Sequence, residues 1–356
     1  MFRCSDRSAR ILIVMSEISK CLTLLQLSKK KHILIIAYSA FGDIVQQLVR
    51  VRRLKECYPD SEITWLACAP YRDFLKSQPF IDQVFVWDRS LGILGFLKLL
   101  YRIRKKHFDV IIDLKGTDRS LLMVLFSRAA LRIGWHSRIQ WGHTFFVKDP
   151  WKALKIEITE EKKPFVFIPQ VINDKVTKQY ELNVRPFVTF LIGASKPEKC
   201  WPITNWIALL NMFSERKIYV DILIMGHGTL ERNIVQEICA KTENPRVKNL
   251  VGELSFIEMA AVMARSMLVV GGDTGPSHLA EMLGVPLIGL FGPTDPKEAG
   301  YNDIAILRAN CKNIGCQNWS CPLPCMETIS PLNVFEAISS LLRKENISGK
   351  GDLNVR

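Results

Sequence analysis

The sequence predicts an α/β protein of two domains, each with a doubly wound parallel sheet of the Rossmann type, that face a common cleft. Short apolar runs alternate along the chain with longer stretches at helical spacing, a pattern typical of parallel sheets covered by helices on both faces. The chain has 356 residues, which is long enough for two such domains. Open α/β sheets bind ligands at the carboxyl ends of their strands, so we expect site residues in the turns that follow strands.

The first domain is expected over residues 31–170. Its first strand is the apolar run 32–37, which ends in a Gly-Asp turn before a helix marked by Ile44, Leu48 and Val49. Further strands are expected at 62–68, 84–87 and 110–114. The polar stretch 157–163, with Pro164 and Pro169 after it, is expected to connect the domains.

The second domain is expected over residues 171–335, followed by a C-terminal helix and tail at 336–356. Its predicted strands are 188–193, 219–225, 267–270 and 287–291. Residues 1–30 form an N-terminal extension in which apolar residues recur at helical spacing. An amphipathic helix there would pack on the rest of the protein or contact a membrane. Alternatively, the whole extension derives from an upstream start codon; the sequence leaves these alternatives open.

Composition and charge narrow the class of protein. Apolar residues make up 48% of the chain and charged residues 23%, which is typical of globular proteins. The net charge of +13 indicates anionic partners: nucleic acid, acidic lipid or phosphorylated glycan. The sequence contains neither an apolar run long enough to span a bilayer nor a clear secretory signal. We therefore expect a cytoplasmic protein whose ten cysteines are reduced thiols.

Four cysteines cluster in a Cys-x4-Cys-x4-Cys-x3-Cys arrangement: Cys311, Cys316, Cys321 and Cys325. Paired Cys-x2-Cys motifs, which are the strong signal for zinc, are missing from this segment. The spacing therefore leaves metal binding open, and we assign no metal ligand.

The most informative pattern is the segment 271–296. It turns through paired glycines into Asp273, Thr274 and Gly275, and then opens a helical pattern that ends at Gly284. The N-terminus of a helix offers backbone N–H groups and the positive end of the helix dipole, which together suit a phosphate.

Two further side chains support an anion site at this turn. Ser277, like Thr274, would add a hydroxyl donor, and His278 would lie one turn into the helix with its ring facing the bound anion. The alternative interpretation is an ordinary strand–turn–helix unit with Asp273 as its N-cap.

Asp43 follows the first strand and could accept a proton from a hydroxyl group held in the cleft. The alternative is an N-cap for the next helix. In the second domain, Lys199 precedes a Trp-Pro pair and could stabilise the charge of a leaving diphosphate; otherwise it is a solvated loop lysine. Gly226 begins a Gly-x-Gly turn that would let a nucleotide approach the backbone, with Glu231 in reach of a ribose.

Basic residues in the first domain fit an anionic acceptor. The stretch 91–106 reads as a basic amphipathic helix, which either lies on an anionic bilayer or packs its apolar face on the sheet in the ordinary way. Arg119, His136 and Arg138 are candidate acceptor-binding residues because of their charge and their position in this domain.

Taken together, these motifs resemble those of the heptosyltransferase family, glycosyltransferase family 9, over residues 31–337. The resemblance rests on Asp-Thr-Gly-x-x-His at 273–278, Ala-x-x-x-Gly-x-Pro at 280–286, Phe-Gly-x-Thr-x-Pro at 291–296, the Gly-Asp pair ending at Asp43, and Lys-x-Trp-Pro at 199–202. It implies a GT-B-like fold, with a catalytic base at Asp43 and a donor nucleotide site at 273–278. It also implies that Lys199 contacts the diphosphate and that Ala194 and Ser195 line its pocket. Gln46 and Gln47 depart from the usual pattern, which leaves acceptor specificity open.

The resemblance implies an inverting transferase that moves a heptose from a nucleotide diphosphate sugar, ADP-heptose, to a lipopolysaccharide core acceptor. The expected partners are this donor, an anionic lipid-linked glycan, and the cytoplasmic face of the inner membrane, with no nucleic acid. We expect no cofactor, and metal-independent catalysis because no Asp-x-Asp pair is present. The alternatives are a nucleotide-sugar epimerase of the same architecture and a basic, non-enzymatic binding protein.

Overall fold

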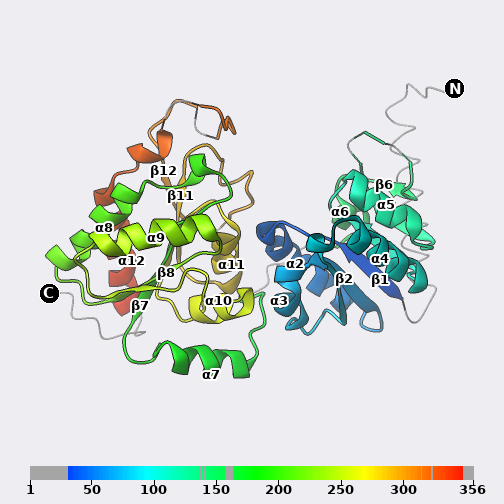
Figure 1. Cartoon of the computed structure of the whole chain (residues 1–356), viewed down its shortest axis with the longest axis horizontal. Helices are drawn as coiled ribbons and strands as arrows, with labels where there is room; N and C mark the ends of the chain where they lie inside the picture. The colour runs from blue at the N-terminus through cyan, green and yellow to red at the C-terminus, as the bar shows by residue number, and fades with distance from the viewer. Residues whose placement is uncertain are drawn as a thin grey trace. The chain divides into compact units, whose positions relative to one another are not determined.

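The fold is described here from a computed structural model, which covers residues 31–136, 138–139, 141–156, 163–302, 304–313, 315–321 and 324–347. The predicted helix in 1–30, most of the predicted connection at 157–163 and the tail 348–356 lie outside these residues. The chain divides into two compact units after residue 162, before the boundary predicted at 170. Each unit is an α/β body built on one sheet (Figure 1).

The first unit contains a six-stranded parallel sheet with the strand order β3-β2-β1-β4-β5-β6. Its strands are β1 (His32–Ile36), β2 (Glu62–Cys68), β3 (Gln83–Trp87), β4 (Val110–Asp113), β5 (Leu131–Gly134) and β6 (Phe145–Phe146). Its helices are α2 (Phe41–Cys57), η1 (Ala69–Tyr71), α3 (Arg72–Lys76), η2 (Arg89–Leu91), α4 (Gly92–Lys105), α5 (Asp118–Phe126) and α6 (Pro150–Ala153).

The second unit repeats this topology, with six parallel strands in the order β12-β11-β10-β7-β8-β9. Its strands are β7 (Phe187–Leu191), β8 (Asp221–Met225), β9 (Val247–Asn249), β10 (Val269–Gly272), β11 (Leu287–Phe291) and β12 (Ala305–Arg308). Its helices are α7 (Gln170–Gln179), η3 (Pro197–Lys199), α8 (Ile203–Glu215), α9 (Thr229–Lys241), α10 (Phe256–Met263), α11 (Gly275–Leu283), η4 (Cys325–Thr328) and α12 (Pro331–Ile347).

The predicted fold class, two doubly wound parallel sheets, is confirmed. In each unit the strand order reverses between the first and the fourth strand: between β1 and β4 in the first unit, and between β7 and β10 in the second. Ligands of open α/β proteins bind at the carboxyl ends of the strands at such a switch point. A ligand-binding site is therefore expected in the turns that follow these four strands.

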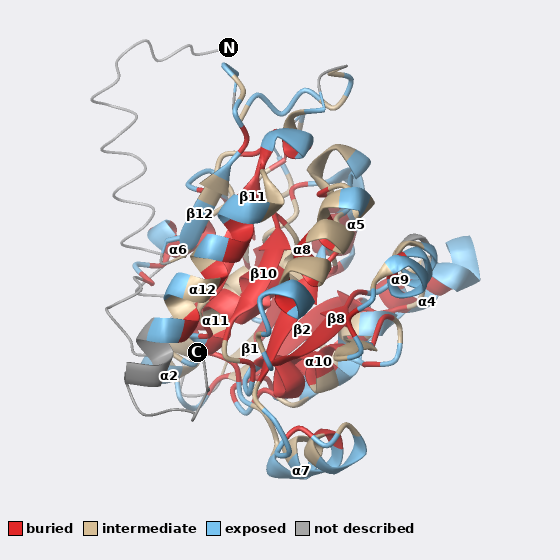
Figure 2. Ribbon diagram, turned by 90° about the vertical axis from the view of Figure 1, so that its left-hand side faces the viewer, coloured by how far each residue is buried: buried red, intermediate tan, exposed pale blue. Residues whose placement is uncertain are grey.

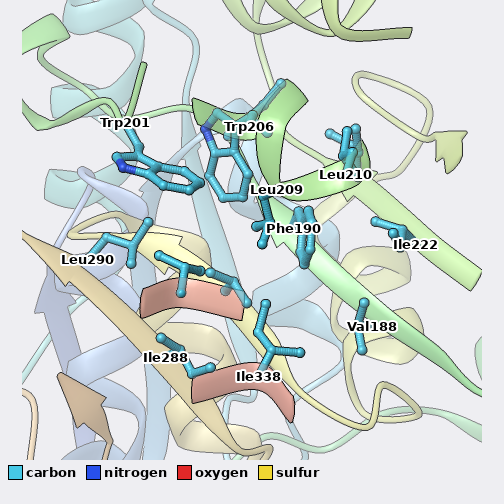
Figure 3. Packing of buried hydrophobic residues seen from close by; sticks show 14 of the residues in the cluster. Val188, Phe190, Trp201, Trp206, Leu209, Leu210, Ile222, Ile288, Leu290 and Ile338 are labelled. Atoms are coloured by element: carbon cyan, nitrogen blue, oxygen red, sulfur yellow. The ribbon is translucent and has the colours of Figure 1, made fainter. Parts of the chain in front are cut away.

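The central strands are buried because their residues are almost all apolar and are covered on both faces, whereas the strands at the sheet edges are partly exposed (Figure 2). In the second unit, Phe190 of β7 packs against Trp206 of α8, and Trp206 meets the Trp201 ring edge to face at 4.8 Å (Figure 3). Trp201 also donates a hydrogen bond from Nε1 to the carbonyl of Ile329, at 2.9 Å. This buried indole fixes the chain two residues after Lys199.

Candidate active site

The second unit carries an ion pair at its switch point. Lys199 lies in η3, after β7, and Asp273 follows β10, the neighbouring strand. The Lys199 Nζ lies 2.5 Å from Asp273 Oδ2, and the two side chains are only 15% and 11% exposed. The backbone also comes close here, since a Cβ added to Gly272 would lie 3.1 Å from the Lys199 carbonyl oxygen. The two residues that were predicted separately from the sequence therefore form one ion pair.

The turn at the start of α11 differs from the sequence-based expectations in three respects. Thr274, not Asp273, is the N-cap residue, so the alternative interpretation of Asp273 as a cap is wrong. Ser277 is buried, and its hydroxyl donates to the Gly272 carbonyl at 2.7 Å, so this hydroxyl is already engaged inside the protein. Pro276 has no N–H, which removes one donor of the first turn. An anion at this turn would therefore be held more by Lys199 than by the end of the helix.

His278 faces Asp273 from the first turn of α11. Its Nε2 lies 3.8 Å from Asp273 Oδ1, and its ring stacks on Tyr301 with centroids 4.1 Å apart. Burial raises the pKa of Tyr301 well above its ordinary value, and the nearby Asp273 carboxylate adds to this effect. The hydroxyl therefore stays protonated and donates to the Thr274 carbonyl at 3.3 Å. This stack fixes His278 beside the ion pair.

Glu231 lies against the glycine turns that follow β7 and β8. A Cβ added to Gly193 would lie 2.3 Å from Glu231 Cγ, and one added to Gly228 would lie 2.6 Å from Oε2. Gly226 also lies close to this side chain: a Cβ added to Gly226 would be 3.2 Å from Glu231 Cβ. These glycines are needed for close approach, and they bring the carboxylate to the carboxyl edge of the sheet.

The loop between β7 and η3 contains Ala194, which is half-buried, and Ser195, which is exposed. An aromatic residue that the sequence analysis missed, Trp319, lies near this loop: its ring centroid is 5.5 Å from Lys199 Nζ and 5.9 Å from Lys196 Nζ. Nothing in its sequence context marked Trp319, because it comes from a Cys-rich loop far along the chain.

The first unit carries a second Lys–Asp pair at its own switch point. Asp43 lies in the first turn of α2, after β1, and its Oδ2 accepts from the Ala40 N–H at 3.2 Å. Lys115 follows β4 and donates from Nζ to Asp43 Oδ2 at 2.8 Å and to the carbonyl of Ser39. Asp43 is not the N-cap, and its side chain is 58% exposed, so the carboxylate is held yet remains accessible.

Cations and aromatic rings surround this pair. Tyr38 and Trp87 form an edge-to-face pair with centroids 5.0 Å apart. Arg89 lies over both rings, at 5.4 Å and 4.9 Å, and donates to Ser39 Oγ at 3.2 Å. Lys115 Nζ lies 5.7 Å from the Tyr38 ring. The neighbourhood of Asp43 is therefore positively charged.

The three predicted acceptor-binding residues have different surroundings. Arg119 is exposed on α5, with its guanidinium 5.8 Å from the Trp87 ring, and Arg138 is exposed in the loop after β5. The His136 side chain is buried: Nε2 lies 3.0 Å from Asp118 Oδ1, and Nδ1 accepts the backbone N–H groups of Arg138 and Ile139. The prediction that His136 binds the acceptor needs correction, because the ring is buried and both of its nitrogens are hydrogen-bonded within the protein, where they hold the loop that carries Arg138.

The clustered cysteines line a cavity of about 320 Å³ together with Cys200. Burial raises the pKa of Cys325, and the neighbouring thiols Cys311, Cys316 and Cys321 raise it further. Among the residues that the structure describes, no three His, Cys, Asp or Glu side chains are arranged to hold a metal ion.

The two doubly wound sheets define an α/β protein of GT-B type, with the Lys199–Asp273 pair at the switch point of the second sheet. The chain belongs to glycosyltransferase family 9 (heptosyltransferase), whose family model matches residues 96–329, more than half of the chain. It is therefore a glycosyltransferase, as the motifs predicted, and both alternatives, an epimerase and a non-enzymatic binding protein, are set aside.

Similar proteins agree with this assignment. The lipopolysaccharide core heptosyltransferase OpsX of Haemophilus influenzae is 27% identical over 295 residues, which cover 77% of this chain and 83% of that protein. The structure of Escherichia coli ADP-heptose lipopolysaccharide heptosyltransferase II has a TM-score of 0.73 at 22% identity, covering 88% of this chain and 99% of the other. The structure of Escherichia coli heptosyltransferase WaaC with ADP-2-deoxy-2-fluoro heptose has a TM-score of 0.68 at 17% identity, covering 87% and 99%.

Proposed function

We propose that this protein transfers a heptose from ADP-heptose to an anionic, lipid-linked acceptor of the lipopolysaccharide core, with inversion at the anomeric carbon. The observation that carries the proposal is the Lys199–Asp273 pair at the switch point of the second sheet. The donor is suggested by the Escherichia coli relatives named for ADP-heptose and solved with its analogue, and the acceptor by the core heptosyltransferase of Haemophilus influenzae.

The donor half of the chemistry follows from the charge of the pair. One N–H of the Lys199 ammonium is used by Asp273, which leaves two donors for oxygens of a diphosphate. A fixed cation stabilises the negative charge that grows on the diphosphate as the glycosidic bond breaks. In this proposal Thr274, Gly275 and Ser195 line the phosphate side of the donor site.

The acceptor half is assigned to the first unit. Asp43 takes the proton of an acceptor hydroxyl, and the oxygen attacks the anomeric carbon while the diphosphate leaves from the opposite face. Lys115 keeps the carboxylate oriented for this transfer. Arg89, Arg119 and Arg138 attract the anionic groups of the acceptor, and the lipid end of the acceptor places the enzyme at the cytoplasmic face of the inner membrane. Among the described residues, no helix is long and apolar enough to cross that membrane.

The direct test is calorimetric titration of the full chain with ADP, UDP, GDP and CMP, with and without EDTA. We expect ADP to bind at least about tenfold more tightly than the others, because the ribose is common to all four and a site that hydrogen-bonds the adenine leaves polar groups unpaired with another base. EDTA should leave this affinity unchanged, since the sequence has no Asp-x-Asp pair. Selective binding of UDP or GDP would refute ADP-heptose as the donor, and no binding at all would refute the donor site.

A second expectation concerns Glu231, which we place on the ribose hydroxyls. In Gly193→Ala the new Cβ would lie 2.3 Å from Glu231 Cγ and 2.5 Å from Oε1, so the carboxylate has to move. The loss of one hydrogen bond to a charged group lowers affinity by roughly 10–100-fold. Titration with ADP should show this loss in Gly193→Ala and an equal one in Glu231→Ala. Unchanged ADP affinity in both variants would remove Glu231 from the donor site.

A further inference from the structure

Helix α4 buries one face and leaves a second apolar face exposed. Leu99, Leu100 and Ile103 are at most 4% exposed and pack into the core of the first unit. On the other side, the exposed fractions are 78% for Ile93, 70% for Leu94, 53% for Leu97 and 66% for Tyr101. Packing on the sheet, the ordinary alternative for this helix, therefore accounts for only half of its apolar residues (Figure 2).

The exposed residues form one continuous stripe. At about 100° per residue, positions 93, 94, 97 and 101 fall within roughly a quarter to a third of the helix circumference. The stripe extends toward the end of α5, where Phe126 is also exposed and its carbonyl accepts from Arg104 Nη1 at 3.5 Å. Soluble proteins rarely expose a contiguous apolar patch unless it meets a partner.

The charges beside the stripe identify the kind of partner. The helix contains only basic charged residues, and all of them are exposed: Lys98, Arg102, Arg104 and Lys105. Arg102 is held over the Phe85 ring at 4.4 Å, so its charge stays beside the helix. Two copies of this surface would repel each other, whereas an anionic bilayer satisfies both the apolar stripe and the cations.

The position of α4 links this surface to the catalytic base. The helix follows η2 directly, and η2 begins with Arg89, which contacts Ser39 and Tyr38 beside Asp43. A lipid-linked acceptor anchored near α4 therefore reaches the region of Asp43 within the same unit.

We infer that the outward face of α4, residues Ile93, Leu94, Leu97 and Tyr101 with the flanking cations, docks this protein on an anionic lipid bilayer. The inference rests on the proposed function, because it supplies the surface through which the enzyme meets its lipid-linked acceptor. In this arrangement the apolar residues insert between the lipid headgroups, and Lys98 and Lys105 contact the anionic headgroups.

The test is co-sedimentation of the full chain with phosphatidylcholine vesicles that contain or lack phosphatidylglycerol. We expect the wild type to bind only the anionic vesicles, and I93S/L94S/L97S to lower this binding at least tenfold. K98Q/K105Q should also weaken binding and flatten its salt dependence. The matched control is V171S/V184S, which removes two equally exposed apolar side chains from the second unit and should bind as the wild type does.

Activity separates this inference from the proposed function. On a deacylated, water-soluble acceptor, I93S/L94S/L97S should turn over like the wild type, and on the same acceptor embedded in vesicles it should be slower. Wild-type vesicle binding by the triple variant would overturn the docking surface. The docking surface would also be overturned if the wild type is a dimer in sedimentation equilibrium and the triple variant is a monomer, because the stripe then binds a second copy of the chain. No transfer by the wild type to either acceptor, with vesicle binding intact, would instead overturn the proposed function.

Discussion

Replacing Asp43 with Asn is expected to lower the rate of sugar transfer by about 10²–10⁴-fold, the usual contribution of a general base. The amide keeps an oxygen that can accept the Ala40 N–H, so the first turn of α2 retains this hydrogen bond. What the variant loses is the negative charge that takes the proton and pairs with Lys115. Because the Asp43 side chain is largely exposed, we expect the free energy of unfolding to change by less than about 1 kcal/mol.

Three measurements check this expectation: the initial rate of transfer, the affinity for ADP, and the melting temperature. ADP affinity should stay at the wild-type value, because the proposed donor residues belong to the second unit. Asp73→Asn is the matched control, since Asp73 is an exposed carboxylate in the first turn of the neighbouring helix α3. Full transfer activity in Asp43→Asn would show that another group is the base.

Lys115 tests whether the base needs a positioning residue. Lys115→Met removes the Nζ donor to Asp43 and to the Ser39 carbonyl but keeps a side chain of similar length. If Lys115 orients the carboxylate, kcat should fall while ADP affinity stays unchanged, and Lys115→Arg should recover part of the rate. Equal kcat in the wild type and Lys115→Met would mean that Lys115 has only a structural role.

Much of the fold could be predicted from the sequence because buried parallel strands are nearly uniformly apolar. The predicted strands at 62–68 and 287–291 coincide with β2 and β11. The strand predicted at 267–270 instead runs as Val269–Gly272, because the two glycines continue the sheet pairing: Gly271 pairs with Leu191 of β7, and Gly272 pairs with Leu290 of β11. The strands β5, β6, β9 and β12 were not predicted because they are short, and no residue of the edge strands β9 and β12 is fully buried.

The sequence predicted candidate site residues one by one, but it did not predict the pairs that they form. Asp273 and Lys199 are 74 positions apart, and only the adjacency of β7 and β10 brings them together. Lys115 was missed although it follows a predicted strand. The strand order would have revealed it, since the ends of the first and fourth strands meet at the switch point. Ser277 was assigned to the ligand because a sequence pattern cannot tell that the Gly272 carbonyl already accepts its hydroxyl.

Replacing Lys199 with Met is expected to lower ADP affinity by roughly 10–100-fold and kcat/KM by about 10²–10³-fold. In the proposed function the cation contacts the diphosphate of the bound donor, and its effect grows as negative charge develops during bond cleavage. The variant also leaves Asp273 without its nearest cation in a mostly buried position, which is expected to cost about 3 kcal/mol of stability.

Stability loss and loss of donor binding have to be separated, because both follow from removing one partner of a buried pair. In the double variant Lys199→Met/Asp273→Asn, no uncompensated carboxylate remains, so the melting temperature should recover toward the wild type. ADP affinity and kcat/KM should stay low, since the cation is still missing. Lys196→Met is the matched control: Lys196 is an exposed lysine of the same loop that also lies near the Trp319 ring, and its loss should leave both values close to those of the wild type. Recovery of ADP affinity together with stability in the double variant would mean that Lys199 serves the fold alone, and the diphosphate would then have to be held elsewhere.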